Sequence, residues 1–346
     1  MTEMDRREGL SPGVAGTPVL VTGAAGFIGS HVVSELLERG YRVAALDDLS
    51  GGFRGNVDER ATFVEGSVLD VDLVNGLFDE HRFTYVFHLA AYAAEGLSHF
   101  IKRFNYQNNL IGSVNLINAS VNHDVRCFVF TSSIAVYGHA HSPVTEETPA
   151  IPVDPYGVAK LAVEQELRIT REMFGLRSII FRPHNVYGER QNIADRYRNV
   201  VGIFMNQILR GEPLSIFGDG TQSRAFSYIS DVAPVMVDAL SRAEAYDQVF
   251  NIGAGRTYTI NELGQAVSRS MGVPFRPRYL PARSEVQHIH ASHDKANSLL
   301  GYESRVGLEE GIDAMATWVK QVGARESTRF TAIEIERKLP TAYKSD

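Results

Sequence analysis

Cysteine and long apolar runs are what this sequence most lacks. Its only cysteine, Cys127, excludes an intrachain disulfide framework and is typical of proteins kept in a reducing compartment. No stretch approaches the roughly 18 apolar residues that are needed to span a bilayer, and residues 1–17 lack the apolar region of a signal peptide. We therefore expect a soluble cytoplasmic protein with no membrane partner.

An excess of positive charge is also missing. Lysine and arginine number 34 against 41 aspartates and glutamates, and this net charge of -7 argues against a nucleic-acid partner. The remaining composition, 44% hydrophobic and 22% charged over 346 residues, is that of a globular protein with a sizeable core.

Short apolar runs rich in valine, isoleucine and phenylalanine alternate with segments of helical period in the first half of the chain. Because the runs are apolar throughout, they indicate parallel strands that are covered by helices on both faces. The sequence therefore predicts an α/β fold with a doubly wound parallel sheet of the Rossmann type. The expected strands are 18–23, 41–47, 61–66, 84–90, 126–132 and 177–183, and the expected helices are 26–39, 70–79, 108–123 and 155–174.

The alternation loosens after residue 183 into a turn-rich region, which indicates a second part of the molecule. We expect a disordered N-terminal extension (1–17), a cofactor-binding Rossmann domain (18–183), a smaller substrate-binding lobe interleaved with it (184–323) and a charged tail without fixed order (324–346). The expected helices of the lobe are 199–210, 231–243, 260–271 and 308–320.

The stretch "VTGAAGFIGSH" places Gly23, Gly26 and Gly29 between an expected strand and an expected helix. Such glycines permit a tight turn and let backbone amides approach a pyrophosphate at the helix N-terminus. The next strand ends at Asp47 and Asp48, where a carboxylate can accept hydrogen bonds from a ribose 2′-hydroxyl and would repel a 2′-phosphate. The pattern indicates NAD rather than NADP, and a glycine-rich turn without a ligand stays the alternative.

A tyrosine and a lysine lie one helical turn apart in "DPYGVAKLAVE". Asp154 suits the N-cap and Pro155 the first helical position, so Tyr156 and Lys160 share a face of the helix. The hydroxyl of Ser133, in "FVFTSSIAVYGH", follows an expected strand at its carboxyl end, where doubly wound sheets bind ligands. The three side chains are candidates for proton transfer; a surface pair and a capping serine are the alternatives without chemistry.

Five motifs in order carry a resemblance: the glycine pattern, "SSIAVYG", "YGVAK", "RPHNVYG" and "GDGTQSRAFSYISDV". Over roughly residues 18–322 the chain resembles the extended branch of the short-chain dehydrogenase/reductase family, and within it the nucleotide-sugar 4-epimerases and dehydratases. The resemblance implies that Ser133, Tyr156 and Lys160 are catalytic and that Asn109 supports the active-site helix.

The resemblance also implies an NAD site and a nucleotide-sugar site, with UDP as the first nucleotide to expect. Planar guanidinium groups at Arg224 and Arg283 suit a diphosphate, and the loop "LAAYAAEGLSHF" offers Tyr92 and Glu95 to the sugar. The expected cofactor-binding residues are Gly23, Gly26, Phe27, Ile28, Gly29, Asp47, Asp48, Leu49, Ser67, Val68, Leu89, Ala90, Ala91, Asn109, Thr131, Tyr156, Lys160 and Pro183. The expected substrate-binding residues are Ser133, Tyr156, His184, Asn185, Arg224 and Arg283.

In the expected reaction Tyr156 removes a proton from a sugar hydroxyl while hydride leaves the same carbon for NAD, and Ser133 holds the hydroxyl. A free phenol has a pKa of about 10, so Lys160 and the oxidised nicotinamide must lower it. Relatives that eliminate water carry an acidic pair where this chain has Ile134 and Ala135. This difference favours 4-epimerisation through a transient 4-keto sugar; a dehydratase or 4-ketoreductase of the same fold and a non-catalytic NAD-sensing protein stay as alternatives.

The histidines of "QHIHASH", His288, His290 and His293, place two imidazoles on one face of an expected strand, as some metal sites do. Hydride transfer needs no metal, so we expect none.

The resemblance implies a homodimer as well. Its expected interface is formed by the helices near 108–123 and 155–174, because in this family these helices commonly pair with their twofold mates.

Overall fold

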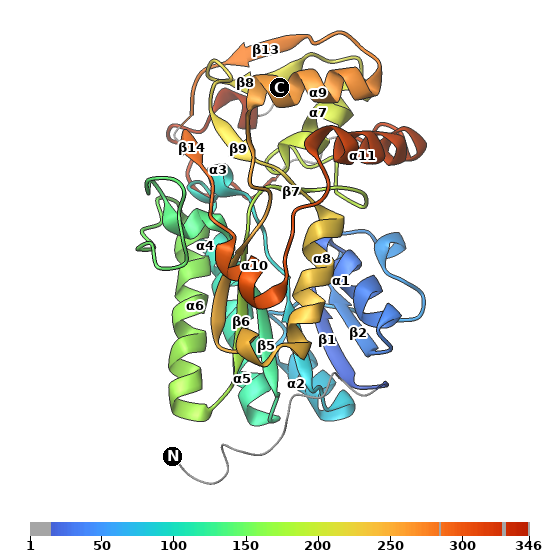
Figure 1. The fold of residues 1–346 in the computed structure, drawn as a ribbon, viewed down its shortest axis with the longest axis vertical. Coiled ribbons are helices and arrows are strands. Elements are labelled where there is room, and N and C mark those ends of the chain that lie inside the picture. The colour runs from blue at the N-terminus through green and yellow to red at the C-terminus, as the bar shows by residue number, and fades with distance from the viewer. Residues whose placement is uncertain (1–14, 284, 327–329, 345–346) are drawn as a thin grey trace.

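A seven-stranded parallel sheet forms the centre of the molecule. The computed structural model describes residues 15–283, 285–326 and 330–344 (Figure 1). The strand order is β11-β6-β5-β4-β1-β2-β3, and the first six strands lie where the sequence predicts them, which confirms the doubly wound Rossmann fold. The strands are β1 (Pro18–Thr22), β2 (Arg42–Asp47), β3 (Thr62–Glu65), β4 (Tyr85–His88), β5 (Cys127–Thr131), β6 (Ser178–Pro183) and β11 (Gln248–Ile252).

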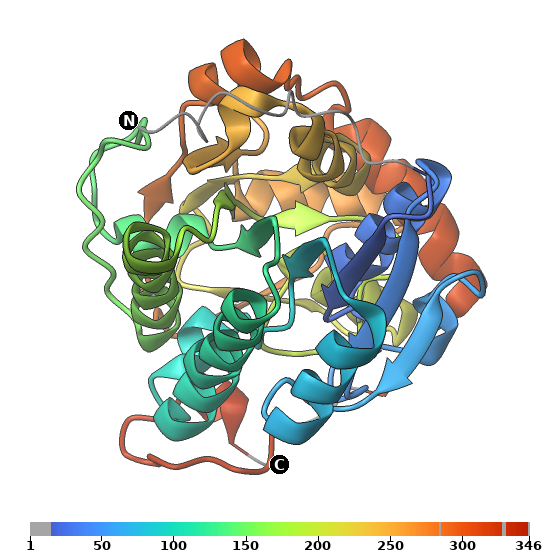
Figure 2. The same cartoon turned by 90° about the horizontal axis from the view of Figure 1, so that it is seen from below.

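Helices cover both faces of this sheet, because successive side chains of each strand point into two different apolar cores. In β1, Val19 and Val21 join one core and Leu20 joins the other. Helices α1 and α8 pack into the first core and α2, α5 and α6 into the second, on opposite sides of the sheet (Figures 1 and 2). These helices are α1 (Phe27–Glu38), α2 (Val71–His81), α5 (Gly112–Asn122), α6 (Pro155–Phe174) and α8 (Ile229–Asp238).

The chain after β6 builds a second lobe at one end of the sheet (Figure 1). Helices α7, α9 and α11 pack together in this lobe, beside three small sheets. Strand β11 returns to the Rossmann sheet and pairs with β6, so the two parts of the chain are interleaved. The lobe contains β7 (Val186–Tyr187), α7 (Val200–Leu209), β8 (Leu214–Phe217), β9 (Ser223–Ala225), β10 (Ser227–Tyr228), β12 (Thr257–Thr259), α9 (Ile260–Met271), β13 (Pro277–Leu280), β14 (His288–Ile289) and α11 (Leu308–Val322). Helix α10 (Asp294–Leu300) packs instead against β11 of the large sheet.

Several short elements were not expected from the sequence. The loop after β4 contains α3 (Glu95–Ser98) and α4 (Lys102–Tyr106), and Gln107–Ile111 forms a π-helical turn before α5. The expected helix 108–123 therefore begins with a different hydrogen-bond pattern. Within the described residues, no helix combines the length and the apolar character needed to cross a membrane.

The C-terminal segment, residues 330–344, corrects the expectation of a tail without fixed order. Leu339 and Tyr343 are buried and share an apolar cluster with Leu97 and Ile101 of the loop after β4. The segment is charged in sequence, but its few apolar side chains fall where this cluster can bury them. The expected N-terminal extension lies outside the described residues up to position 14.

Candidate active site

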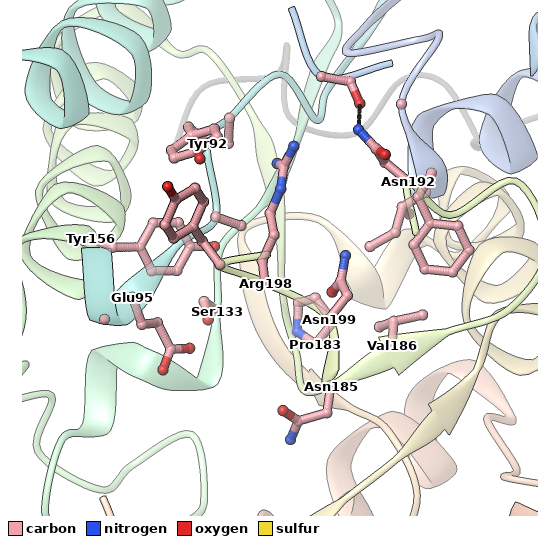
Figure 3. Close-up of a pocket in the computed structure, with 18 of the residues that line it drawn as sticks. Tyr92, Glu95, Ser133, Tyr156, Pro183, Asn185, Val186, Asn192, Arg198 and Asn199 are labelled. Atoms are coloured by element: carbon pink, nitrogen blue, oxygen red, sulfur yellow. Dashed lines mark hydrogen bonds between the residues drawn. The ribbon is translucent and has the colours of Figure 1, made fainter. Parts of the chain in front are cut away.

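A cavity of about 450 Å³ lies between the carboxyl ends of the Rossmann strands and the second lobe, a size typical of small-molecule sites. Parts of both walls are visible in Figure 3, one from the Rossmann domain (Tyr92, Glu95, Ser133 and Tyr156) and one from the lobe (Asn185, Val186, Arg198 and Asn199). The site therefore needs both parts of the chain.

The glycine loop between β1 and α1 has no room for side chains. Gly23 has a φ of +68°, and a Cβ there would lie 2.7 Å from the backbone nitrogen of Ala90. A Cβ on Gly29 would lie 2.0 Å from the carbonyl oxygen of Gly23. Helix α1 starts directly after Gly26, which has no side chain to cap the helix. The first amides of α1 are thus free to bind a pyrophosphate, as an NAD site requires.

Asp47, at the end of β2, fastens this loop. One carboxylate oxygen accepts a hydrogen bond from the backbone nitrogen of Ala25 at 2.9 Å, and the other accepts from that of Leu49 at 2.8 Å. Burial raises the pKa of Asp47, and the backbone hydrogen bonds oppose this rise. A carboxylate has about four acceptor sites, more than the three backbone amides of Leu49, Ala25 and Gly26 use, so Asp47, which lines the cavity beside Asp48, can also accept from a ribose hydroxyl.

Helix α6 presents Tyr156 and Lys160 to the cavity from its first turns. Asp154 caps the helix by accepting from the backbone nitrogen of Gly157 at 2.8 Å, and Pro155 occupies the first helical position. The ammonium group of Lys160 donates to the carbonyl oxygen of Thr131 at 2.8 Å. Burial lowers the pKa of Lys160 to about 7. Its charge is therefore sensitive to any anion or cation bound nearby.

Ser133 follows β5, and its side chain lies near that of Tyr156 at the same wall of the cavity (Figure 3). Burial raises the pKa of the Tyr156 phenol, the carboxylate of Glu95 adds to the rise, and a side-chain hydrogen bond with Ser133 opposes it. The sequence led us to expect a lowered pKa, and the side chains of the protein do not produce this lowering. Lys160 lies 5.8 Å from the centre of the Tyr156 ring, so further positive charge has to come from the ligand side.

A buried ion pair fixes α6 against the sheet below these residues. Glu164, one turn after Lys160, accepts from Nε of Arg182 at 2.9 Å, and Arg182 also donates to the hydroxyl of Tyr137 at 2.7 Å. The hydroxyl of Ser132 donates to the same carboxylate. Glu164 and Arg182 are both nearly inaccessible to solvent, so the pair joins the middle of α6 to the end of β6 inside the protein.

The loop after β4 brings the side chains of Tyr92 and Glu95 to the cavity. Asn109 does not line the cavity; its amide instead accepts from the backbone nitrogen of Tyr92 at 2.8 Å and donates to the backbone oxygen of Tyr92 at 3.1 Å. The carboxylate of Glu95 projects into the cavity (Figure 3). Although solvent reaches it through the opening, the enclosing protein raises its pKa to about 7, Asp154 adds to the rise and Arg224 opposes it.

Arg224 and Arg283 both line the cavity, near Glu95. Arg224 donates to the backbone oxygens of Ser223 and Gln287 at 2.8 Å, and the guanidinium of Arg283 lies 4.5 Å from the ring centre of Phe217. Asn185 lines the cavity as well. Two guanidinium groups at one wall suit a diphosphate, and both are paired there with the carboxylate of Glu285, at 3.6 Å from Arg224 and 3.2 Å from Arg283. Ser284, between Arg283 and Glu285, lies outside the described residues.

Most of the expected site residues line this cavity, and four do not. Leu49, Ser67, Asn109 and His184 are absent from its walls. The clearest correction is His184, which points away from the cavity and into the lobe. Its Nε2 lies 2.8 Å from Nε2 of His293, and the two rings stack. Burial lowers the pKa of His184 to about 3, so this histidine is a neutral structural group.

Sequence reasoning also missed residues that the lobe brings to the cavity. Arg198 lines the wall, and its guanidinium lies 4.7 Å from the ring centre of Tyr92. Asn199, the residue before α7, has a φ of +64° and faces the cavity (Figure 3). Neither belongs to a recognisable motif, and the only signal for Asn199 is that asparagine tolerates left-handed backbone.

The histidines of the "QHIHASH" stretch serve structural contacts. Nδ1 of His288 lies 2.9 Å from the hydroxyl of Ser223, and His293 is paired with His184. In the part of the chain that the structure describes, no group of three histidine, cysteine or acidic side chains is arranged to hold a metal ion.

Comparison with known proteins finds a family model, relatives and solved structures that are all described as epimerases. The model of the NAD dependent epimerase/dehydratase family matches residues 19–253. A putative UDP-glucose 4-epimerase of Methanocaldococcus jannaschii is 35% identical, over 87% of this chain and 98% of that protein. The solved UDP-glucose 4-epimerase of Thermotoga maritima, with UDP-glucose, has a TM-score of 0.85 at 37% identity, over 88% of this chain and 99% of that chain. The UDP-glucuronic acid 4-epimerase of Bacillus cereus, with UDP-glucuronic acid and NAD, has a TM-score of 0.81 at 32% identity, over 88% and 100%.

These matches agree with the geometry of the cavity. The glycine loop and Asp47 have the form of a dinucleotide site, and Ser133, Tyr156 and Lys160 stand beside it. The family match confirms both the family expected from the sequence and NAD as its cofactor. The chain belongs to the NAD dependent epimerase/dehydratase family.

Proposed function

We propose that this chain is an NAD-dependent UDP-hexose 4-epimerase. The observation that carries the proposal is the meeting of Ser133, Tyr156 and Lys160 in one cavity with the glycine loop. A phenol, a hydroxyl and a cation next to a dinucleotide cradle are the groups that oxidation of a secondary alcohol needs. The relatives named above are 4-epimerases of UDP-sugars by name, and they support 4-epimerisation as the reaction.

Each of the three side chains has a defined task in this reaction. Tyr156 accepts the proton of the C4 hydroxyl and later returns it, while Ser133 holds the C4 oxygen through both steps. Lys160 stabilises the phenolate through its charge. Bound NAD would supply the acceptor for the C4 hydride and, as its reduced form, the hydride that returns to C4. Rotation of the 4-keto sugar between the two steps exposes its other face to the same groups, so the configuration at C4 is inverted.

The arginines of the cavity wall support a nucleoside diphosphate as the carrier of the sugar. Arg224 and Arg283 offer two cations there, and UDP is the carrier bound by the relatives. Close to Tyr156, the Glu95 carboxyl is a poor neighbour for a second carboxylate, since like charges repel at short distance. A neutral hexose is therefore the better substrate, and a uronic acid the worse one.

An NMR and mass assay in deuterated water tests the activity directly. Purified enzyme without added cofactor is incubated with UDP-, GDP- and dTDP-hexoses. A product of unchanged mass, inverted at C4 and without deuterium at C5, is the expected result. If no 4-epimer forms in any of the reactions, the proposal is refuted.

A 4,6-dehydratase is the second candidate, because of the position of Glu95. A small recess off the cavity is bordered by Glu95, Ile134 and Ala135. Ile134 and Ala135 occupy the positions at which the sequence lacks an acidic pair, and Glu95 could supply an acid from the opposite side. Loss of water together with deuterium gain at C5, in the same assay, would favour this candidate.

We propose that the protein acts as a homodimer through α6 and the turn before α5. Four exposed apolar side chains of α6 and one of that turn support this interface: Val158, Ile169, Met173, Phe174 and Ile111. Apolar groups gathered on neighbouring helices are typical of a surface that another chain covers. We also propose a cytoplasmic location, because the single cysteine is a buried free thiol and suits a reducing compartment. We further propose that the chain divides into a cofactor domain (18–183) and a substrate lobe (184–323).

A further inference from the structure

The C-terminal segment lies against the loop that carries Tyr92. The ring of Phe330 packs 4.7 Å from that of Phe104 and 5.5 Å from that of Tyr92. The carboxylate of Glu334 accepts hydrogen bonds from the backbone nitrogens of Arg103 and Phe104 at 2.9 and 3.0 Å. The first half of the segment therefore fastens the loop after β4, one wall of the cavity, from the outside.

The second half of the segment contacts residues of the second lobe that line the cavity. Tyr343 is buried between the rings of Tyr197 and Phe217, whose centres lie 5.1 and 6.3 Å from its own. Its hydroxyl accepts a hydrogen bond from Nη1 of Arg283 at 3.0 Å. Tyr343 itself does not line the cavity, whereas Tyr197, Phe217 and Arg283 do. The segment thus contacts a predicted phosphate-binding arginine from behind.

The surroundings of Arg283 fix its guanidinium and leave several of its five N–H donors free. Its plane lies over Phe217, Nη1 donates to Tyr343, and Nη2 donates to Glu285 at 3.2 Å. Its Nε is buried and has no hydrogen-bond partner within the described residues. Nη1 and Nη2 each use one N–H in these contacts, so the second N–H of each stays available to a ligand oxygen in the cavity. Tyr343 anchors Arg283 with a neutral oxygen, whereas Glu285 pairs with it as a carboxylate at 3.2 Å.

We propose that the C-terminal segment is part of the substrate site, in which Tyr343 positions Arg283 so that its guanidinium donates to a phosphate oxygen of the nucleotide sugar. This inference rests on the function proposed above, because it takes a nucleoside diphosphate as the ligand. Tyr343 is a positioning residue, since its hydroxyl contacts Arg283 and not the cavity. Its removal should therefore affect binding and leave the chemical step unchanged.

Titration calorimetry with UDP on the full-length, NAD-loaded protein tests this role. Tyr343→Phe keeps the buried ring and removes one hydrogen bond, so we expect the Kd for UDP to rise about three- to tenfold. KM for the UDP-sugar should rise by the same factor and kcat should stay within about twofold. Tyr279→Phe is the matched control, because the Tyr279 hydroxyl bonds Asn261 at an exposed edge of the same lobe. We expect no change in this control.

A double-mutant cycle with Arg283→Lys separates positioning from general loosening. If Tyr343 acts through Arg283, adding Tyr343→Phe to Arg283→Lys should weaken UDP binding little further. An equal loss in both backgrounds, or an unchanged Kd for Tyr343→Phe alone, would overturn this inference while leaving the proposed function standing. Failure of the unmodified protein to bind UDP would overturn both.

Discussion

Tyr156 is held in a site where the chain alone opposes ionisation of its phenol, since burial and Glu95 both raise its pKa. Tyr156→Phe removes only the hydroxyl, so bound NAD should be retained while turnover falls by at least about 10²-fold, the usual scale for a general base. The NMR assay gives the turnover, and the absorbance of cofactor released on denaturation gives the NAD content. Near-normal turnover would remove Tyr156 from its assigned role.

Glu95 gives the sugar pocket a carboxyl group that titrates near neutral pH, because its pKa is raised to about 7. It is mainly protonated at about pH 6 and mainly ionised at about pH 8. A glucuronate carboxylate is ionised throughout this range, so KM for UDP-glucuronate should rise about tenfold between these values, equivalent to about 1.4 kcal/mol. KM for UDP-glucose should change much less.

The matched variant for this prediction is Glu95→Gln, which keeps the shape of the side chain and cannot ionise. In this variant the difference between the two substrates should no longer depend on pH. Parallel pH profiles for the wild type and the variant would show that Glu95 does not face the sugar.

Residues whose role follows from a short sequence motif could be predicted from the sequence. The glycines are needed because their Cβ positions are filled by backbone, and Tyr156 and Lys160 follow a visible cap at Asp154. His184 could not be predicted, because its partner His293 is more than 100 positions away in the sequence. The direction of such a side chain is decided by packing between the two parts of the chain.

At the scale of elements, the Glu164–Arg182 pair joins α6 to β6. Glu164→Gln leaves the Arg182 charge buried and without a counterion, so the free energy of unfolding should fall by about 3 kcal/mol or more. Urea denaturation of the cofactor-free protein measures this. Glu172→Gln on the same helix is the control: its partner Arg168 is exposed, and such pairs contribute at most about 1 kcal/mol. Equal effects of the two variants would contradict a structural role for the buried pair.

The long elements were predictable and the short ones were not. Helix α6 has Asp154 and Pro155 at its start and Gly175, with a φ of +78°, after its end, so its bounds can be read from the sequence. Helices α3 and α4 have four and five residues. Runs this short carry no helical period, and their conformation is set by the contacts of the loop, including those with the C-terminal segment.

At the scale of the whole molecule, the proposed dimer makes a testable claim about α6. Met173 is 71% exposed and Ile169 47% exposed, and a glutamate at both positions would place like charges across the twofold axis. Ile169→Glu combined with Met173→Glu should give a monomer in sedimentation analysis. Val273→Glu, at an exposed apolar position beyond α9, is the control. Wild-type protein that sediments as a monomer, or a variant that stays dimeric, would refute this interface.

The return of β11 to the Rossmann sheet makes the two parts of the chain one folding unit. β11 pairs with β6 from Ile179 to Pro183, so a fragment that ends at residue 183 would leave an apolar strand edge open to other chains. The lobe that we propose to bind the substrate is thus also the piece that closes the sheet. Its specificity cannot be changed by exchanging the lobe as a module; it has to change through single side chains in the loops.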